Sequence, residues 1–205
     1  MTTVLLEVTG LSCRRGGRMV LGNISFELAG GELLALTGRN GSGKTTLLRA
    51  LALLVRAEAG RICWHGEDVV RDRESWRRQV AWLGHLDGLK GDLSVQENLS
   101  VAARLRDEAP DRIARALAAF DLEPLARRDV RTLSAGQRRR AALARVAASH
   151  APLWLLDEPL NALDAPSQAA LRAALGGHLA AGGLAIAATH APIGVPGARA
   201  LELGR

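Results

Sequence analysis

The chain has 205 residues, of which 48% are hydrophobic and 23% are charged. These are the proportions of an ordinary globular domain, and they exclude a disordered chain, a collagen-like chain and a small disulfide scaffold. The length allows one domain with a sizeable core and a small inserted lobe. With only Cys13 and Cys63 and no signal-peptide pattern, the sequence supports neither a disulfide framework nor a multi-cysteine zinc site, and it favours a reducing cytoplasm.

The net charge is +6 and the isoelectric point is near 10.8, so a phosphate-rich partner has to be considered. Lysine occurs only at Lys44 and Lys90, and the arginines are scattered along the chain. The absence of tyrosine leaves few aromatic rings for stacking nucleic-acid bases. We therefore expect a solvated basic surface and no nucleic-acid partner. Apolar runs such as residues 153–156 are too short to cross a bilayer, so any membrane role depends on a partner.

The N-terminal part of the chain consists mainly of short β-prone runs separated by glycines. These runs predict strands at residues 4–8, 24–28, 33–37, 61–64 and 79–83. One helix interrupts them. Leu47, Leu48, Leu51 and Leu54 recur at helical spacing, which predicts a helix that begins at residue 43 or 44 and ends at residue 54.

Between residues 86 and 150 the apolar pattern changes to helical spacing. The helix-start signals in this stretch are a capping box at Ser94 and Glu97, a second box at Ser134 and Gln137, and a cap at Asp111 for a helix at 113–120.

An apolar strand at 153–156, a helix from about Pro166 and an apolar strand at 184–188 complete the chain. Strands that are apolar without alternation indicate a largely parallel sheet covered on both faces, and hence an α/β core. We predict a single domain with its core at residues 1–85 and 151–205 and a helical subdomain at about 86–150.

Residues 38–45 fit the phosphate-loop pattern G-x-x-x-x-G-K-[ST] and lie between a predicted strand and a predicted helix. The glycines let successive backbone N–H groups face the phosphates of a nucleotide, with the positive end of the helix dipole behind them. Lys44 would bridge the phosphates, and the Thr45 hydroxyl would bind Mg²⁺. The residues predicted to bind the nucleotide are Gly38, Arg39, Asn40, Gly41, Ser42, Gly43, Lys44, Thr45 and Thr46.

The strand at 153–156 leads into two carboxylates, Asp157 and Glu158. Burying two carboxylates is unfavourable unless a cation lies nearby. We therefore predict that Asp157 holds Mg²⁺, directly or through water, and that Glu158 is the general base that polarises the attacking water. Alone, this pair could equally cap the next turn. Behind a phosphate loop, catalysis is the stronger interpretation.

A third element consists of Leu133, Ser134, Ala135, Gly136 and Gln137, and it resembles the signature motif of the ABC family. In that family two nucleotide-binding domains pair head to tail, and the signature helix of one presents its N-terminus to the γ-phosphate held by the other. A helix dipole and a serine hydroxyl suit an anion. The resemblance implies a P-loop NTPase fold of the ABC type, with an antiparallel β subdomain, and pairing with a second copy of the chain or another ATPase subunit.

Two further segments follow in the order of the ABC family. Residues 161–164 resemble the loop that lies across the dimer interface, with Asp164 as its carboxylate. His190 resembles the histidine that hydrogen-bonds the γ-phosphate, a role that suits an imidazole near neutral pH. The resemblance covers essentially the whole chain. It implies hydrolysis of ATP with Mg²⁺, with Lys44, Glu158 and His190 as catalytic residues.

Two positions depart from the ABC pattern. The ring that stacks on adenine usually lies near residues 13–16, where this sequence has no aromatic residue, and we expect Arg15 to stack its planar guanidinium instead. The glutamine of the loop that follows residue 83 is replaced by His85. His85 could bind Mg²⁺ or its water through a ring nitrogen, or it could be an ordinary loop residue, and both interpretations stay open.

Several short segments narrow the resemblance to the ATP-binding subunit of the cytochrome c maturation haem exporter: residues 11–14, 84–85, 88–90, 97–99 and 151–154. Leu86 stands where that subfamily has a glutamine. The resemblance implies a peripheral subunit on the cytoplasmic face of a bacterial inner membrane, docked on the integral membrane subunits of the exporter. We expect its coupling surface around residues 85–93.

Other functions stay open at this stage. The chain could energise a different exporter, because the motor motifs would be the same. A soluble ABC protein that acts on nucleic acid or ribosomes has only the basic isoelectric point in its favour. Cys63 and His65 are conceivable iron ligands on one face of a strand, but a β-hairpin before Gly66 is the stronger interpretation.

Overall fold

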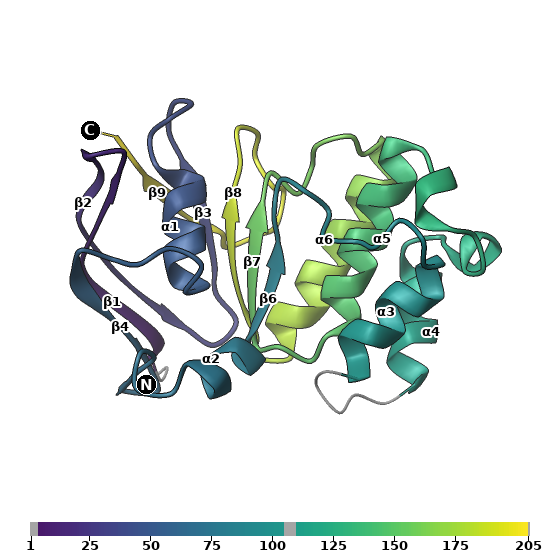
Figure 1. Ribbon diagram of the computed structural model, residues 1–205, viewed down its shortest axis with the longest axis horizontal. Coiled ribbons are helices and arrows are strands. Elements are labelled where there is room, and N and C mark those ends of the chain that lie inside the picture. The colour runs from purple at the N-terminus through teal and green to yellow at the C-terminus, as the bar shows by residue number, and fades with distance from the viewer. Residues whose placement is uncertain (1–3, 105–109, 205) are drawn as a thin grey trace.

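The computed structural model describes residues 4–104 and 110–204, which form two β-sheets and several helices (Figure 1). The strands are β1 (Val4–Arg15), β2 (Arg18–Ala29), β3 (Leu33–Thr37), β4 (Ala59–Trp64), β5 (Glu67–Asp68), β6 (Val80–Leu83), β7 (Leu153–Asp157), β8 (Leu184–Ala188) and β9 (Arg199–Glu202). The helices are α1 (Lys44–Leu51), α2 (Arg73–Gln79), α3 (Val95–Arg104), α4 (Pro110–Ala119), α5 (Ala135–Ala148) and α6 (Ala165–Ala180), with 3₁₀ turns at Glu123–Leu125 and Val130–Thr132. Within the described ranges, no helix has the length and apolarity needed to span a membrane.

The core sheet has five strands in the order β6-β7-β8-β3-β9, and every pairing is parallel. Along β7, Leu153 and Leu155 face one side of the sheet, whereas Trp154 and Leu156 face the other, because side chains alternate along a strand. Both sets are buried, which explains the unbroken apolar run in the sequence. The prediction of a parallel, doubly covered α/β core is confirmed.

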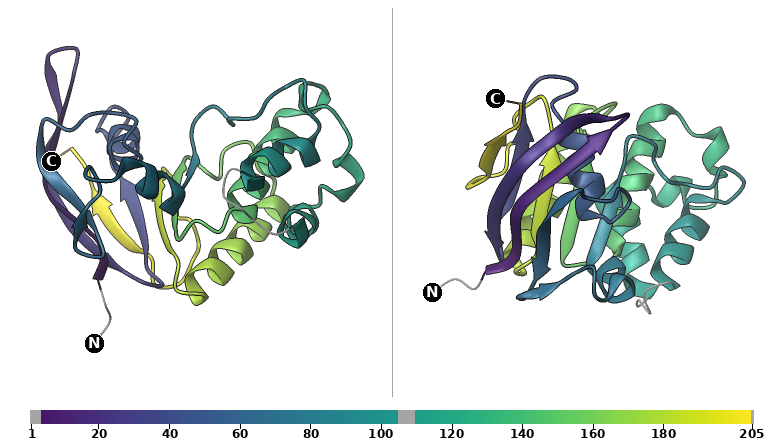
Figure 2. Two further views of the ribbon diagram at one scale, coloured as in Figure 1. Left: turned by 60° about the horizontal axis from the view of Figure 1, so that its bottom comes forward. Right: turned by 60° about the vertical axis from the view of Figure 1, so that its left-hand side comes forward.

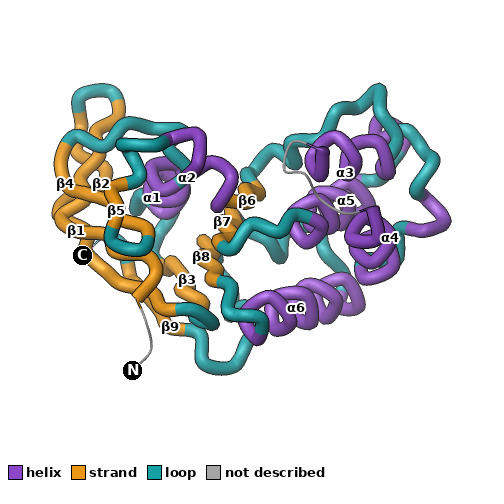
Figure 3. Tube along the Cα trace, turned by 90° about the horizontal axis from the view of Figure 1, so that it is seen from below, coloured by secondary structure: helices purple, strands orange, loops and turns teal. Residues whose placement is uncertain are grey.

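Different elements cover the two faces of the core sheet (Figures 1 and 3). On one face, α1 and the antiparallel sheet form a cluster that includes Leu47, Leu48 and Leu51. On the other face, α5 and α6 form a second cluster, which includes Leu171 and Leu175 and continues into α3 and α4. The phosphate-loop helix and the signature helix therefore lie on opposite faces of the same sheet.

The antiparallel sheet has the order β2-β1-β4-β5. Its first two strands are 12 residues each, longer than the strands predicted at 4–8 and 24–28. Their pairing continues past Gly10, which has φ of 61° at a register shift between Val8 and Leu11. A bulge of this kind keeps a strand paired across an irregular residue. The β1-β2 hairpin consequently projects beyond the body of the protein (Figure 2).

Three more predicted elements begin or end at other residues than expected. Helix α1 ends at Leu51 rather than at residue 54, because Leu53 adopts φ of 54° and Leu54 turns outward with 60% of its surface exposed. The strand predicted at 79–83 begins at Val80, because Gln79 is the last residue of helix α2, which was not predicted. Helix α4 is described from Pro110 to Ala119, so Asp111 lies inside the helix and is not the cap predicted for a helix at 113–120.

The two capping boxes are confirmed. Ser94 Oγ accepts the N–H of Glu97 (3.2 Å), and the Glu97 carboxylate accepts the N–H of Ser94 (2.8 Å). Ser134 and Gln137 make the same reciprocal pair at 3.2 and 2.9 Å. Each box satisfies backbone donors that the first turn of a helix leaves without an internal partner, so it fixes where α3 and α5 begin.

Candidate active site

The phosphate loop connects β3 to α1 at the carboxyl edge of the core sheet. Gly38, Gly41 and Gly43 have φ of 128°, 82° and 98°, values that favour glycine. A Cβ on Gly43 would lie 2.6 Å from Leu21 Cδ2, and a Cβ on Gly38 would meet the backbone oxygen of Leu203. The predicted pattern therefore matches a tightly curled loop that runs into a helix N-terminus.

Lys44 is almost completely buried at the start of α1, with 7% of its surface exposed. Its Nζ donates to the backbone oxygens of Gly38 (2.8 Å) and Arg39 (3.3 Å). The ammonium group thus lies inside the curl of the loop. Phosphate oxygens that enter this curl would meet a positive charge and a helix N-terminus together.

Thr45 and Asp157 join the phosphate loop to the end of β7. The Thr45 hydroxyl donates to Asp157 Oδ1 at 3.0 Å, and Asp157 is 3% exposed. A hydroxyl and a carboxylate are the hard oxygen ligands that Mg²⁺ prefers, so this pair fits the ion. The described residues contain no cluster of three His, Cys, Asp or Glu side chains that could hold a metal. The rest of the ion's shell would therefore come from nucleotide phosphates and water, as is usual for Mg²⁺.

Glu158 and His190 meet where β7 and β8 end. His190 Nε2 lies 3.2 Å from Glu158 Oε1, and the carboxylate is the less exposed of the two side chains. The backbone of Glu158 has φ of 47°, and its N–H donates to the oxygen of Ala188 at 2.9 Å. A left-handed conformation is unfavourable for a glutamate, so the surrounding contacts hold this residue in place. The geometry suits a base with an imidazole beside it.

The signature segment lies at the N-terminus of α5. Ser134 is the exposed N-cap of this helix, and Leu133 beside it is buried. A Cβ on Gly136 would lie 3.0 Å from the Ala162 oxygen, so glycine lets the helix approach the loop at residues 161–164 closely. Because α5 and α1 cover opposite faces of the sheet, the structure does not bring Ser134 to the phosphate loop of the same chain.

Asp164 has a clear local role as the N-cap of α6. Its carboxylate accepts the N–H of Ser167 at 3.0 Å. Hydrogen bonds from Ser167 hold the pKa of the Asp164 carboxyl below its usual value. The carboxylate is exposed, so contact with a second chain stays a prediction beside this capping role.

Arg15 and His85 are both exposed. Arg15 is the last residue of β1 and pairs with Arg18 near the tip of the hairpin. His85 follows Gly84 in the loop after β6, and no contact described for it reaches Thr45 or Asp157. The roles of Arg15 in adenine stacking and of His85 at the metal stay predictions.

The sequence did not single out Arg139, which the structure places against the backbone of Asp157 and Glu158. Its guanidinium donates to the backbone oxygens of Asp157 (2.7 Å) and Glu158 (2.6 Å). The sequence does not distinguish it, because it is the middle of three consecutive arginines at residues 138–140, but the structure buries it on the apolar side of α5. Such a residue is rarely buried without partners.

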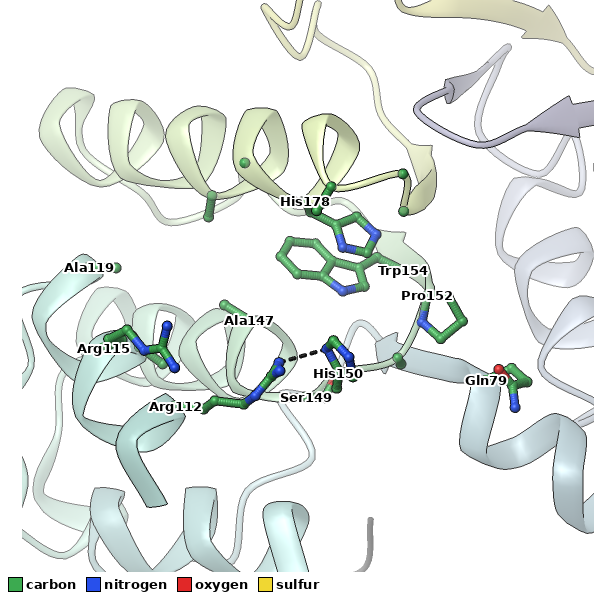
Figure 4. Close-up of a pocket in the computed structure, with 17 residues that line it drawn as sticks. Gln79, Arg112, Arg115, Ala119, Ala147, Ser149, His150, Pro152, Trp154 and His178 are labelled. Atoms are coloured by element: carbon green, nitrogen blue, oxygen red, sulfur yellow. Dashed lines mark hydrogen bonds between the residues drawn. The ribbon is translucent and has the colours of Figure 1, made fainter. Parts of the chain in front are cut away.

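A cavity of about 960 Å³ lies at the opposite edge of the core sheet, between α4 and α6 (Figure 4). Its wall includes Trp154, which stacks on His178 with ring centroids 4.1 Å apart, and Arg112, which bonds His150 Nδ1 at 2.7 Å. Burial lowers the pKa of His178. This cavity is formed where β7 and β8 begin, whereas the phosphate loop and Glu158 lie where strands end, so it is not the nucleotide site.

The two cysteines are buried and free. Burial raises the pKa of both thiols. Cys63 lies in β4, whereas His65 follows the strand in a turn with φ of 49°, so the two residues do not continue one regular strand face. The β-hairpin interpretation of this segment agrees with the antiparallel pairing of β4 and β5.

Comparison with known proteins agrees with this geometry. The model of the ABC transporter family matches residues 21–161. A cytochrome c biogenesis ATP-binding export protein CcmA from Rhodospirillum rubrum is 48% identical over 94% of this chain and 83% of the relative. The protein of the same name from Cupriavidus necator is 48% identical over 97% of this chain and 88% of the relative.

Solved structures share the fold. The ATP-binding subunit of an ABC transporter superposes with a TM-score of 0.84 at 28% identity, covering 91% of this chain and 80% of that chain. The ATP-binding cassette MJ0796, bound to ADP and Pi, superposes with a TM-score of 0.82 at 22% identity, covering 91% of this chain and 88% of that chain. The family match and the curated relatives show that the chain belongs to the ABC transporter family, as an ATP-hydrolysing subunit most like the CcmA proteins.

Proposed function

We propose that the chain is the ATP-hydrolysing subunit of a membrane ABC complex that exports or delivers haem during c-type cytochrome biogenesis. One observation carries this proposal: near full-length similarity to cytochrome c biogenesis export proteins in a chain that keeps the ATPase side chains together at one sheet edge. Haem as the cargo comes from the subfamily resemblance of the sequence. A different exporter remains the alternative, since it would use the same motor residues.

Three segments would share the work of hydrolysis. The backbone N–H groups of residues 38–43 and the Lys44 ammonium bind the phosphates. Thr45 and Asp157 would hold Mg²⁺, which neutralises phosphate charge when bound. The Glu158 carboxylate accepts a proton from the attacking water.

His190 and the Glu158 carboxylate would act together. His190 Nε2, 3.2 Å from Glu158 Oε1, is placed to orient both the carboxylate and the γ-phosphate. Glu158→Gln would keep the size of the side chain and remove the base. We expect this variant to accumulate in an ATP-bound state.

A second copy of the chain would complete each site. Ser134 and the N-terminus of α5 lie on the face of the sheet away from the chain's own phosphate loop, so they are available to a nucleotide held by another copy. A helix N-terminus with a serine hydroxyl favours a γ-phosphate. We therefore propose a head-to-tail dimer with two ATP molecules between the chains, with Asp164 near the contact.

The loop after β6 is the proposed contact for the membrane subunits. It connects the core sheet to α3, and Leu86 in this loop has 83% of its surface exposed. A partner helix at residues 85–93 would touch both the core and the helical subdomain, which we place at about residues 86–150. We propose a peripheral location on the cytoplasmic face of the bacterial inner membrane.

Two measurements test the proposal. Cells depleted of the protein should lose covalent haem attachment to c-type cytochromes, and wild-type chain but not Glu158→Gln should restore it. Glu123→Gln, the same substitution at an exposed position of the 3₁₀ turn, is the matched control and should restore it fully. The protein extracted gently from these membranes should co-purify with multi-spanning subunits and a haem-carrying protein. If depleted cells made normal c-type cytochromes, the haem assignment would be wrong, and the chain would be the ATPase subunit of another exporter.

A further inference from the structure

Arg139 lies at the point where α5 meets the ends of two core strands. It is the charged residue on the buried face of α5 and is 5% exposed. Its guanidinium makes contacts at two sites. One is the peptide backbone at the end of β7, and the other is the loop that follows β6.

The contacts divide between the two terminal nitrogens. Nη2 donates to the backbone oxygens of Asp157 and Glu158 at 2.7 and 2.6 Å. Nη1 donates to the backbone oxygen of Gly84 at 3.0 Å and lies 3.3 Å from Asp87 Oδ1. A planar guanidinium can hold several acceptors in a fixed geometry, which the single ammonium of lysine cannot reproduce.

These contacts bear directly on the catalytic carboxylate. Glu158 has a left-handed backbone, and its N–H is fixed by the oxygen of Ala188. Arg139 fixes the carbonyl of the same residue. The backbone of Glu158 is therefore held on both sides, which aims its side chain at His190.

We propose that Arg139 is a positioning residue for ATP hydrolysis. By holding the Asp157 and Glu158 carbonyls, it keeps the Glu158 carboxylate where it can accept a proton from water. Because Arg139 also binds Gly84 and Asp87, a shift of the loop after β6 would move the base. This second part rests on the proposed membrane contact, whereas the positioning of Glu158 rests on ATP hydrolysis alone.

The test separates positioning from simple stability. In the purified full chain, Arg139→Lys should lower kcat for ATP about tenfold or more while KM changes less than about twofold, since the phosphate loop is untouched. Arg140→Lys is the matched control, because it makes the same substitution at the next residue on α5, which bonds Phe120 and Asp121, away from Glu158. It should lower the melting temperature and leave kcat within about twofold.

Two further measurements keep the result decisive. In a Glu158→Gln background, Arg139→Lys should still form the ATP-bound dimer, because only the placement of the base is disturbed. Asp87→Asn removes the charged partner without removing Arg139, and it should lower kcat less than Arg139→Lys does, with non-additive effects in the double variant. A normal kcat in Arg139→Lys would overturn the proposal. The proposal would also be overturned if Arg139→Lys weakened ATP binding, prevented dimer formation and lowered the melting temperature together, because the residue would then be structural. All these readouts use the chain without its partners, so they are independent of the haem assignment.

Discussion

Substitutions of Ser134 separate its two roles, as a helix cap and as a phosphate contact across the dimer. Ser134→Ala removes the side-chain half of the capping box, in which Oγ accepts the N–H of Gln137 at 3.2 Å, and should cost about 1 kcal/mol of stability. For a domain of this size that is a drop of about 2–4 °C in melting temperature. Ser134→Asp keeps an N-cap acceptor, so its stability should stay within a few tenths of a kcal/mol of the wild type.

The aspartate places a negative charge where the γ-phosphate of the other chain is proposed to bind. Two unit charges 4 Å apart at an effective dielectric constant of 20 repel by about 4 kcal/mol. This corresponds to a loss of about three orders of magnitude in dimer affinity at each site. Ser134→Asp should therefore be stable and yet unable to dimerise with ATP, whereas Ser134→Ala should be less stable and dimerise more weakly.

Light scattering with ATP in a Glu158→Gln background measures the dimer, and thermal unfolding measures the stability. Ser94→Ala is the matched control, because it removes the same side-chain cap from α3, where Oγ accepts the N–H of Glu97, and leaves the signature intact. It should lose about 1 kcal/mol and dimerise normally. If Ser134→Asp dimerised with ATP as readily as its Glu158→Gln parent, the signature helix would not meet the nucleotide.

Three further variants address the metal, the base of the nucleotide and acid stability. Thr45→Val removes the hydroxyl that contacts Asp157, so Mg²⁺-dependent ATP hydrolysis should fall at least about tenfold, and a magnesium titration that matches the wild type would contradict the role. Arg15→Ala should weaken ATP binding a few-fold if the guanidinium stacks on adenine, and unchanged affinity by calorimetry would exclude stacking. Burial lowers the pKa of His178 below 6.5, so the unfolded chain binds a proton first and stability is lost as pH falls from 6.5 through the lower folded value. His178→Gln should flatten this loss in urea titrations at pH 7.5 and 5.5, and an unchanged slope would show that another group is responsible.

Much of the fold could be predicted because the burial of an element determines the spacing of its apolar residues in the sequence. The strands at 153–156 and 184–188 are apolar throughout, since both faces of the core sheet are covered. The capping boxes at Ser94 and Ser134 marked helix starts correctly, because the signal and its hydrogen bonds are local. Strand β9 was missed, since its burial pattern is mostly exposed and only its pairing with β3 makes it a strand.

The candidate site, like the fold, could be predicted from the sequence only in part. The phosphate loop and the Asp157–Glu158 pair could be proposed from spacing, because the chemistry predicted for them needs particular side chains in a particular order. Arg139 could not be found in this way. Three of its four acceptors are backbone oxygens, which any residue supplies, so nothing at positions 84, 157 or 158 signals the contact.

The burial of both thiols makes the chain convenient for site-directed labelling. Cys13 and Cys63 have 0% and 8% of their surface exposed, and burial raises the pKa of each thiol. Thiolates are the species that react with maleimides, so both native residues should label slowly at neutral pH. A single cysteine introduced at exposed Glu123, outside the signature segment, could carry a spin label or fluorophore in the otherwise unaltered sequence. The distance between two such labels would then report the approach of two chains during an ATP cycle.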